Sequence, residues 1–187
     1  MVNRPGSHEG SRLNERLARD LRDRRPEVVD QLLVSYGRRI QGVAYLILGS
    51  HADAEEIVID TLVTAWRKGN DLRDPNALGA WLLRIATRLA LTRRRRIGAT
   101  LPLLAEQAAR LAGAAAPSID GVALRDALAT LPPRMRAAIV LHYYADLTVD
   151  GVATALERSP NTIKSQLREG LSRLRRQLRD SPGRADG

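Results

Sequence analysis

Apolar residues recur every three or four positions through most of this chain, and turn signals interrupt them at intervals. One such stripe runs from Val29 to Ile47 and stops at Gly49-Ser50. This repeat places side chains on one face of a helix, whereas a half-buried strand needs strict alternation, which stands out nowhere in the chain. The pattern therefore predicts an all-α fold, arranged as two small helical domains without an internal repeat.

Two further helices are predicted in the first half of the chain. Asp53 precedes Glu56 at the spacing of a capping box, which predicts a helix start there. Asp74-Pro75 combines an N-cap residue with a proline at the first helical position, and so predicts a third helix. Its apolar side chains face inward, and its other face carries arginines, namely Arg84, Arg88 and Arg93 to Arg96.

Composition along the chain predicts its division into segments. Residues 97–120 are rich in Ala, Gly and Pro, which is typical of a linker with room for a short helix at 103–112. Residues 1–25 are polar and predict a loose tail, at most a frayed helix. The predicted segments are a tail (1–25), a first helical domain (26–96), the linker (97–120), a second helical domain (121–180) and a C-terminal tail (181–187).

The net charge of +9 is concentrated in two short stretches. Residues 74–97 hold six arginines against one aspartate, and residues 158–180 hold six arginines and a lysine against two acidic residues, so each is +5. A polyanion, most commonly nucleic acid, is the partner that such blocks indicate. A pair of solvated helix faces is the simpler alternative.

Several classes of function are not supported by the composition. The chain has no cysteine, so disulfides and Cys-ligated zinc are excluded, and its three histidines are scattered without neighbouring carboxylates. We expect no metal site, no cofactor and no small-molecule substrate. Long hydrophobic runs are absent, so we expect no membrane insertion and a cytoplasmic protein.

The last two predicted helices have the form of a helix-turn-helix. Thr148 can cap the first, and Ser159-Pro160 gives a cap and an N1 proline for the second. Ile163 and Leu167 would pack inward. The outer side near the start of the second helix, the part of a recognition helix that enters the major groove, carries Ser159, Asn161, Thr162, Lys164, Ser165 and Arg168. Helical hairpins of this kind also occur in proteins that do not bind DNA.

Two long runs resemble one family in the same order. The run LPPRMRAAIVLHYYADLTVDGVATALERSPNTIKSQLREGLSRLRRQL resembles the −35-reading domain of bacterial extracytoplasmic-function (ECF) sigma factors of the sigma-70 family, actinobacterial-like. DAEEIVIDTLVTAWRK and AWLLRIATRLALTRRRR resemble their −10-reading and polymerase-docking domain. The matches cover about residues 27–96 and 121–179.

The resemblance implies a protein that binds core RNA polymerase, directs it to particular promoters and assists duplex opening. A dedicated anti-sigma factor is a further implied partner. The acidic helix would dock on polymerase through Asp53, Glu55, Glu56 and Asp60, although acids at a helix N-terminus also complement the helix dipole. The −35 element would meet the helix-turn-helix residues named above. The −10 element would meet Asn70, Asp71, Asn76, Arg84, Arg88, Arg93, Arg94 and Arg95.

Three positions depart from the family pattern. Arg88 stands where Asn is usual, Thr92 replaces a common Asp, and Glu157 occupies the turn where Gly is common, so Glu157 must adopt a left-handed conformation or the turn is of another type. The loop 69–76 also has no aromatic residue, which argues against base capture by stacking.

Two other functions compete with this interpretation. A stand-alone helix-turn-helix regulator would bind an operator without polymerase, but it leaves the first basic block and the acidic helix unused. An enzyme acting on nucleic acid lacks a carboxylate cluster, a Gly-rich phosphate loop and a nucleophile paired with a base, so we expect no catalysis.

The linker length agrees with two separated promoter elements. Its 24 residues span at most about 80 Å when extended, and elements two helical turns apart are separated by roughly 70 Å. Without polymerase the acidic surface at 53–60 and the basic surface at 158–180 have opposite signs. Their attraction would favour an autoinhibited form in which the two domains pack on each other.

Overall fold

The computed structural model describes residues 7–100 and 119–180, and every regular element in these two ranges is helical. The all-α prediction is therefore confirmed. The first range holds α1 (Ser7–Arg22), α2 (Val28–Leu48), α3 (His51–Arg67), the 3₁₀ turns η1 (Gly69–Asp71) and η2 (Pro75–Ala77), and α4 (Leu78–Thr100). The second holds α6 (Ile119–Thr130), α7 (Pro133–Ile139), the π-helical turn η3 (Val140–Tyr144), α8 (Val149–Leu156) and α9 (Pro160–Asp180). The helix expected at 103–112 and the tail 181–187 lie outside the described residues.

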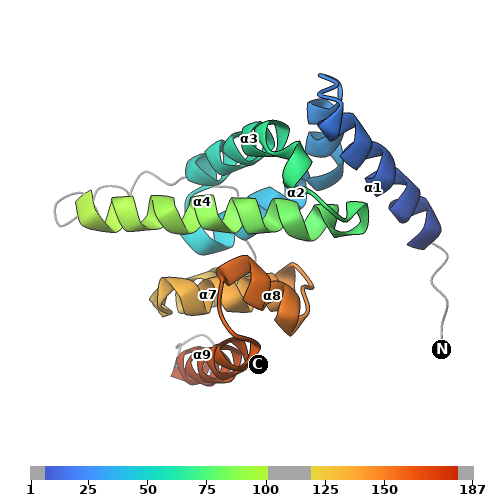
Figure 1. Ribbon diagram of the computed structural model, residues 1–187. Coiled ribbons are helices and arrows are strands. Elements are labelled where there is room, and N and C mark those ends of the chain that lie inside the picture. The colour runs from blue at the N-terminus through green and yellow to red at the C-terminus, as the bar shows by residue number, and fades with distance from the viewer. Residues whose placement is uncertain (1–6, 101–118, 181–187) are drawn as a thin grey trace.

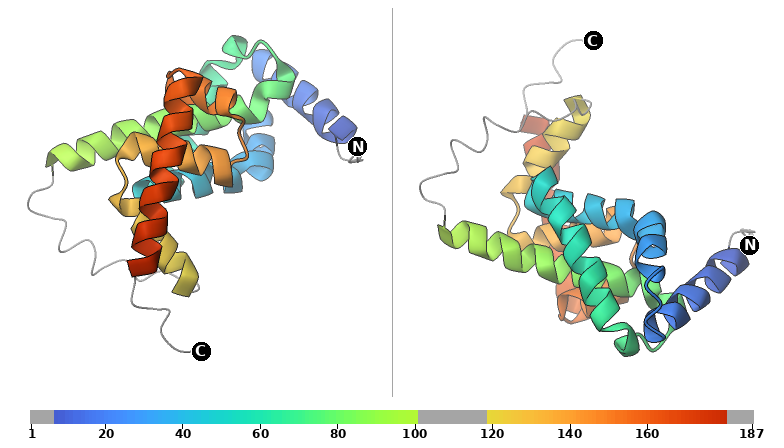
Figure 2. Two further views of the ribbon diagram at one scale, coloured as in Figure 1. Left: turned by 90° about the horizontal axis from the view of Figure 1, so that it is seen from below. Right: turned by 90° about the horizontal axis from the view of Figure 1, so that it is seen from above.

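The helices form two groups that pack against each other (Figure 1). In the first, α2, α3 and α4 contact one another, and α1 lies across α2 and the two 3₁₀ turns. In the second, α9 packs on α6, α7 and α8. The groups meet where α8 and α7 pack on α4 and where η3, α6 and α7 pack on α2, and the views from below and above in Figure 2 place α9 on the far side from α2.

The first turn between helices follows from two residues that occupy their preferred positions. Gly49 ends α2 in the left-handed region at φ 80°, and its N–H donates to the Tyr45 carbonyl at 2.7 Å. Ser50 then caps α3, because its Oγ accepts from the Asp53 N–H at 3.2 Å. The predicted start at Asp53 was therefore wrong by one turn: Asp53 is the third helical residue, and Ser50 is the cap.

The N-terminal segment was also predicted wrongly. Residues 7–22 form α1, a regular amphipathic helix, where the sequence suggested a loose tail. Leu17, Ala18 and Leu21 are at most 1 % exposed, because they pack against the first group of helices. These few apolar side chains anchor a helix whose other positions are mostly polar, and their burial supplies the stability that its composition does not.

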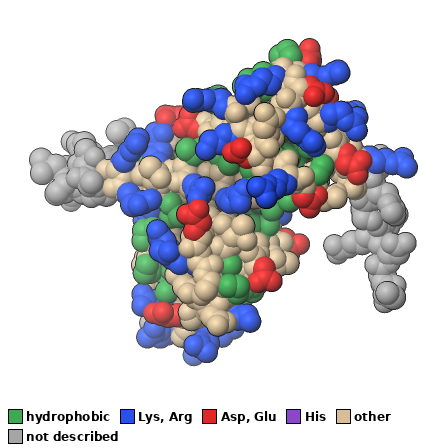
Figure 3. Space-filling view, viewed as in Figure 1, with side chains coloured by type: hydrophobic (Ala, Val, Ile, Leu, Met, Phe, Trp, Pro, Cys, Tyr) green, Lys and Arg blue, Asp and Glu red, His purple; other side chains and the backbone are tan. Residues whose placement is uncertain are grey.

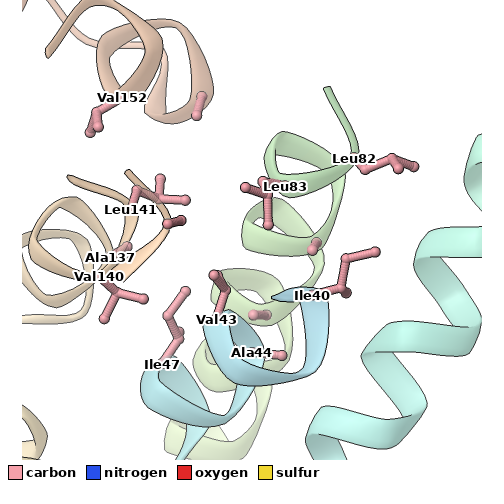
Figure 4. Packing of buried hydrophobic residues seen from close by; sticks show 14 of the residues in the cluster. Ile40, Val43, Ala44, Ile47, Leu82, Leu83, Ala137, Val140, Leu141 and Val152 are labelled. Atoms are coloured by element: carbon pink, nitrogen blue, oxygen red, sulfur yellow. The ribbon is translucent and has the colours of Figure 1, made fainter. Parts of the chain in front are cut away.

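The buried side chains of the two groups form one continuous hydrophobic cluster. Figure 4 shows Val43 and Ile47 of α2 lying toward Val140 and Leu141, with Val152 of α8 beyond them. The two predicted helical halves therefore pack on each other, and each half completes its core with side chains of the other. Within the described ranges, no helix combines the length and hydropathy needed to cross a membrane.

Candidate nucleic-acid interface

The helix-turn-helix has the predicted caps. Thr148 Oγ1 accepts from the Gly151 N–H at 3.1 Å and starts α8. Ser159 Oγ accepts from the Thr162 N–H at 3.1 Å and starts α9. Between them Glu157 is left-handed, at φ 54° and ψ 55°, so the first of the two alternatives for this turn is correct. An open groove of about 570 Å³ lies between α8 and the start of α9.

The first two turns of α9 present polar side chains to solvent. Ile163 is fully buried and Leu167 nearly so, whereas Asn161, Lys164 and Arg168 are exposed. The hydroxyl groups are already engaged. Ser159 Oγ and Thr162 Oγ1 lie 2.8 Å apart, and Ser165 Oγ donates to the Thr162 carbonyl at 2.8 Å. The predicted set thus divides into three exposed side chains, Asn161, Lys164 and Arg168, and three hydroxyl residues that bond within the first turns of α9.

The loop 69–76 is fixed by contacts with α1. Leu72 is buried at 3 % exposure, and Gly69 packs directly on the backbone of Leu21. Ser11 Oγ donates to Asn76 Oδ1 at 2.7 Å, while the Asn76 N–H donates to Asp74 Oδ1 at 2.9 Å and so confirms the predicted cap. Asn70 and Asp71 lie exposed beside this anchored part.

Sequence reasoning missed α1 as a support for this loop. The signal that could have found it is the spacing of Leu13, Leu17 and Leu21, which repeats every four residues within an otherwise polar segment. Three leucines among many charged residues are a weak pattern on their own.

The arginines of α4 do not form one free basic face. Figure 3 shows basic side chains, which on α4 are all arginines, with acidic side chains among them. Arg93 Nε lies 2.7 Å from Asp53 Oδ1, and its Nη1 lies 2.6 Å from Glu56 Oε2. The hydrogen bond with Glu56 is the largest influence that raises the pKa of Arg93. Arg93 therefore joins two of the predicted polymerase-binding acids to a predicted DNA-binding helix.

The other predicted arginines of α4 have different surroundings. Arg94 is half-buried, and its Nη1 donates to the Ile47 carbonyl at 3.0 Å at the end of α2. Burial lowers its pKa. Arg88 forms an ion pair with Glu157 of the helix-turn-helix. Arg84 is half-buried and Arg95 is exposed.

The outer surface of α3 mixes acids with apolar side chains. Glu55 and Asp60 are exposed, in contrast to Asp53, whose carboxylate faces Arg93. Ile59 and Val63 lie one turn apart and are 62 % and 51 % exposed. Exposed apolar residues beside exposed carboxylates are more typical of a protein-binding surface than of a nucleic-acid site. The site predicted from the sequence included only the acidic residues of this surface.

Comparisons with known proteins match both halves in order. Residues 32–100 match the model of sigma-70 region 2, and residues 121–174 match that of sigma-70 region 4. The ECF RNA polymerase sigma factor SigM of Mycobacterium tuberculosis (strain Erdman) is 30 % identical over 175 residues, which cover 92 % of this chain and 87 % of SigM. This chain belongs to the ECF sigma factors of the sigma-70 family.

A second curated relative and a solved structure are also similar to this chain. SigE of Mycolicibacterium smegmatis is 31 % identical over 155 residues, 78 % of this sigma factor but 60 % of SigE. The sigma factor RpoE of Bartonella quintana, solved with the anti-sigma factor NepR, superposes with a TM-score of 0.65 at 23 % identity over 81 % of this chain and 97 % of that one, which supports the shared fold.

Family membership assigns the general function. The protein is a sigma factor for promoter-specific transcription initiation by RNA polymerase, a transcription regulator rather than a catalyst. The alternative of a stand-alone operator-binding regulator is not favoured, because the chain matches region 2 as well as region 4.

Proposed function

We propose that this sigma factor divides its work among three surfaces: the start of α9 for the −35 element, the loop 69–76 with α4 for the −10 element, and the outer face of α3 for core RNA polymerase. The observation that supports it best is the exposed polar start of α9 in a capped helix-turn-helix. The units that carry these functions are residues 7–100, extended by α1 beyond the predicted 26–96, and residues 119–180, joined by the linker.

At the −35 element, the long side chains Lys164 and Arg168 supply the contacts to phosphates or guanine edges, and Asn161 is placed to bond adenine. Ser159, Thr162 and Ser165 position the helix and leave the first backbone N–H groups directed toward a phosphate. Base discrimination therefore depends on three side chains, and the hydroxyl residues act on affinity through geometry.

At the −10 element, Asn70 and Asp71 are the exposed polar groups that can accept an unstacked base. Asn76 holds the loop on α1 through Ser11 rather than reaching DNA. Arg84 and Arg95 remain available for the strand backbone, and Arg88 becomes available when it leaves Glu157. Arg93 and Arg94 act mainly within the protein, since each already has partners there.

On α3, the docking surface for polymerase consists of Glu55 and Asp60 around Ile59 and Val63. Exposed carboxylates increase the association rate with a basic partner, and the apolar pair supplies the area that water leaves on binding. Asp53 and Glu56 contribute less, because Arg93 neutralises them. Since polymerase and the chromosome share one compartment, the protein acts in the cytoplasm, without catalysis of its own. An anti-sigma factor is a further partner, as the RpoE structure shows for that relative.

Run-off transcription tests this proposal. Core RNA polymerase with the protein and a genomic promoter library is expected to start transcripts that core alone does not start, and their 5′ ends define the promoter. Lys164→Ala with Arg168→Ala is expected to abolish dependence on the −35 sequence while binding to core is retained. Arg175→Ala with Arg176→Ala, farther along the exposed side of α9, is the matched control. Loss of core binding in the first variant would contradict the division of work.

A further inference from the structure

A hollow lined by arginines lies beside the contact of α4 with α7 and α8 (Figure 1), whereas α3 and α9, whose opposite charges predicted a contact, are not packed together. The volume of the hollow is about 310 Å³. Arg88, Thr92 and Arg95 form one wall, because their spacing places them on one face of α4. Arg134 of α7 and Glu157, which follows α8, form the other wall. Side chains from three separate helical segments therefore build the hollow.

The hollow carries more positive than negative charge. Three guanidinium groups line it against a single carboxylate, and that carboxylate, of Glu157, is paired with Arg88. Arg95 and Arg134 are exposed, and within the described residues neither forms a hydrogen bond or an ion pair. Two cations that face one hollow of this size repel each other, and an anion between them reverses that repulsion.

The three positions that depart from the family pattern all line this hollow. Arg88 adds a positive charge where Asn is usual, and Thr92 removes a negative charge where Asp is common. Thr92 also offers an exposed hydroxyl that can donate to an anion, which a carboxylate would repel. Glu157 adds one negative charge, but it faces Arg88. The departures therefore change the charge of one site in favour of an anion.

The lining residues indicate which kind of anion fits. A guanidinium group binds phosphate through paired N–H donors in a planar fork, which makes arginine well suited to phosphate recognition. The two arginines without partners come from different helices, so a ligand with two linked phosphates can engage both. Ligand sites commonly measure about 300–1,000 Å³, so this hollow suits a small molecule. Leu91 and Leu156 also line it and offer apolar surface beside the charges.

We propose that this hollow binds a diphosphate group, either free inorganic diphosphate or the diphosphate of a nucleotide. Arg95 and Arg134 hold the two phosphates from opposite walls, and Thr92 donates a further hydrogen bond. The site stands apart from the three surfaces proposed above, except that Arg95 also belongs to the proposed −10 surface. Competition between diphosphate and the −10 strand for Arg95 is a consequence that rests on the proposed function.

Calorimetric titration of the full chain with inorganic diphosphate tests the site directly. Saturable binding is expected, with a Kd below about 1 mM at roughly physiological ionic strength. Sulfate has a single tetrahedral group and cannot engage both walls, so it should bind at least about tenfold more weakly at the same ionic strength. Absence of saturable diphosphate binding below about 1 mM would overturn the proposal.

Substitutions on both walls locate the binding. Arg95→Gln and Arg134→Gln are each expected to weaken diphosphate binding about tenfold or more, because each removes a charge-assisted hydrogen bond. Thr92→Asp should weaken it at least as much, because it places a like charge beside the phosphates. Arg176→Gln is the matched control, since this arginine is exposed on α9, has no partner within the described residues and lies outside the hollow. All four positions are exposed, and unchanged helical circular dichroism checks that each variant folds.

The two walls give separate ways for the proposal to fail. An effect of Arg95→Gln without an effect of Arg134→Gln would show that the arginines of α4 bind the anion alone, and would overturn a site in the hollow. Equal affinities in all variants and in the Arg176→Gln control would show diffuse attraction to a basic surface, and would overturn it as well. Loss of binding on both walls with an unchanged control supports the site.

Titration with ADP and with GDP distinguishes the two sources of the diphosphate. Binding at least about threefold tighter than that of inorganic diphosphate supports a nucleotide, whose nucleoside then covers Leu91 and Leu156. Equal or weaker binding supports the inorganic ion. The outcome is independent of transcription: a chain that binds no diphosphate can still start transcripts with core polymerase. A chain that binds diphosphate but starts none refutes the proposed function alone.

Discussion

Replacing Gly69 by alanine tests whether α1 supports the loop 69–76, which is the proposed −10 site. A Cβ at this position would lie 2.9 Å from the Leu21 carbonyl oxygen and 3.1 Å from both the carbonyl carbon and the Cβ of the same residue. Ordinary van der Waals contact begins at 3.4 Å, so α1 and the loop at Gly69 must separate by roughly half an ångström. Two of the three atoms are backbone, and Leu21 is 1 % exposed, so no flexible side chain can absorb the shift.

The expected loss of stability follows from this geometry. Overpacking of a close contact costs about 1–3 kcal/mol, because α1 must tilt away and loosen Leu17 and Leu21. For a chain of this length that corresponds to a melting temperature about 2–12 °C lower. Initiation that depends on the −10 sequence should fall together with stability, because Asn70 and Asp71 move with the loop.

Thermal unfolding followed by circular dichroism measures the first effect, and transcription from promoters with altered −10 sequences measures the second. Gly10→Ala is the control, with no atom within 4 Å of its added Cβ, and it should be neutral or stabilising by up to about 1 kcal/mol. A Gly69→Ala protein as stable as wild type, within about 0.5 kcal/mol, would refute the close contact and the supporting role of α1.

Three other substitutions test separate parts of the structure. Ser159→Ala removes the cap that accepts from the Thr162 N–H and should lower the free energy of unfolding by about 1 kcal/mol in denaturant titrations. Gly170→Ala places a Cβ 2.9 Å from a side-chain carbon of α7 and should cost about 1–3 kcal/mol, unless that side chain repacks. Tyr36 has a pKa above its usual 10 because of burial, so the folded state holds its proton more tightly and loses stability as pH rises above 10. Tyr36→Phe should weaken that loss in unfolding measured against pH, while breaking the 2.5 Å hydrogen bond to Asn14; an unchanged alkaline slope would contradict the assignment.

The extent to which the fold could be predicted depended on local signals. The helices α2 and α4 follow from apolar stripes and from Gly49 and Asp74, which act within a few residues. The helix α1 carries few apolar residues and forms a helix because α2 and the loop 69–76 bury them, a tertiary contact that periodicity does not report. The π-helical turn after α7 likewise has no local sequence signal that we can identify.

Whether a feature of the candidate sites could be predicted also depended on whether its signal is local. The polar start of α9 could be predicted, because capping residues and helical spacing determine which side chains face outward. The state of the α4 arginines could not, because Arg88 finds Glu157 and Arg93 finds Asp53 across long sequence separations. An arginine on the outer face of a predicted helix is free only if no other element packs there, and that depends on the tertiary fold.

The free energies of the individual contacts show which of them contributes most to the packing of the two halves. A left-handed conformation costs a residue such as Glu157 about 1–2 kcal/mol, and this cost is present whether the halves are packed or separate. Its ion pair with Arg88, both side chains more than half exposed, contributes only about 0–1 kcal/mol. The pair therefore cannot be the main source of stability. Burial of apolar side chains such as Val43 and Val140, about 1.5–3 kcal/mol for each that is fully buried, is the larger contribution. The ion pair is instead a polar contact at the edge of this interface, between α4 and the turn that follows α8.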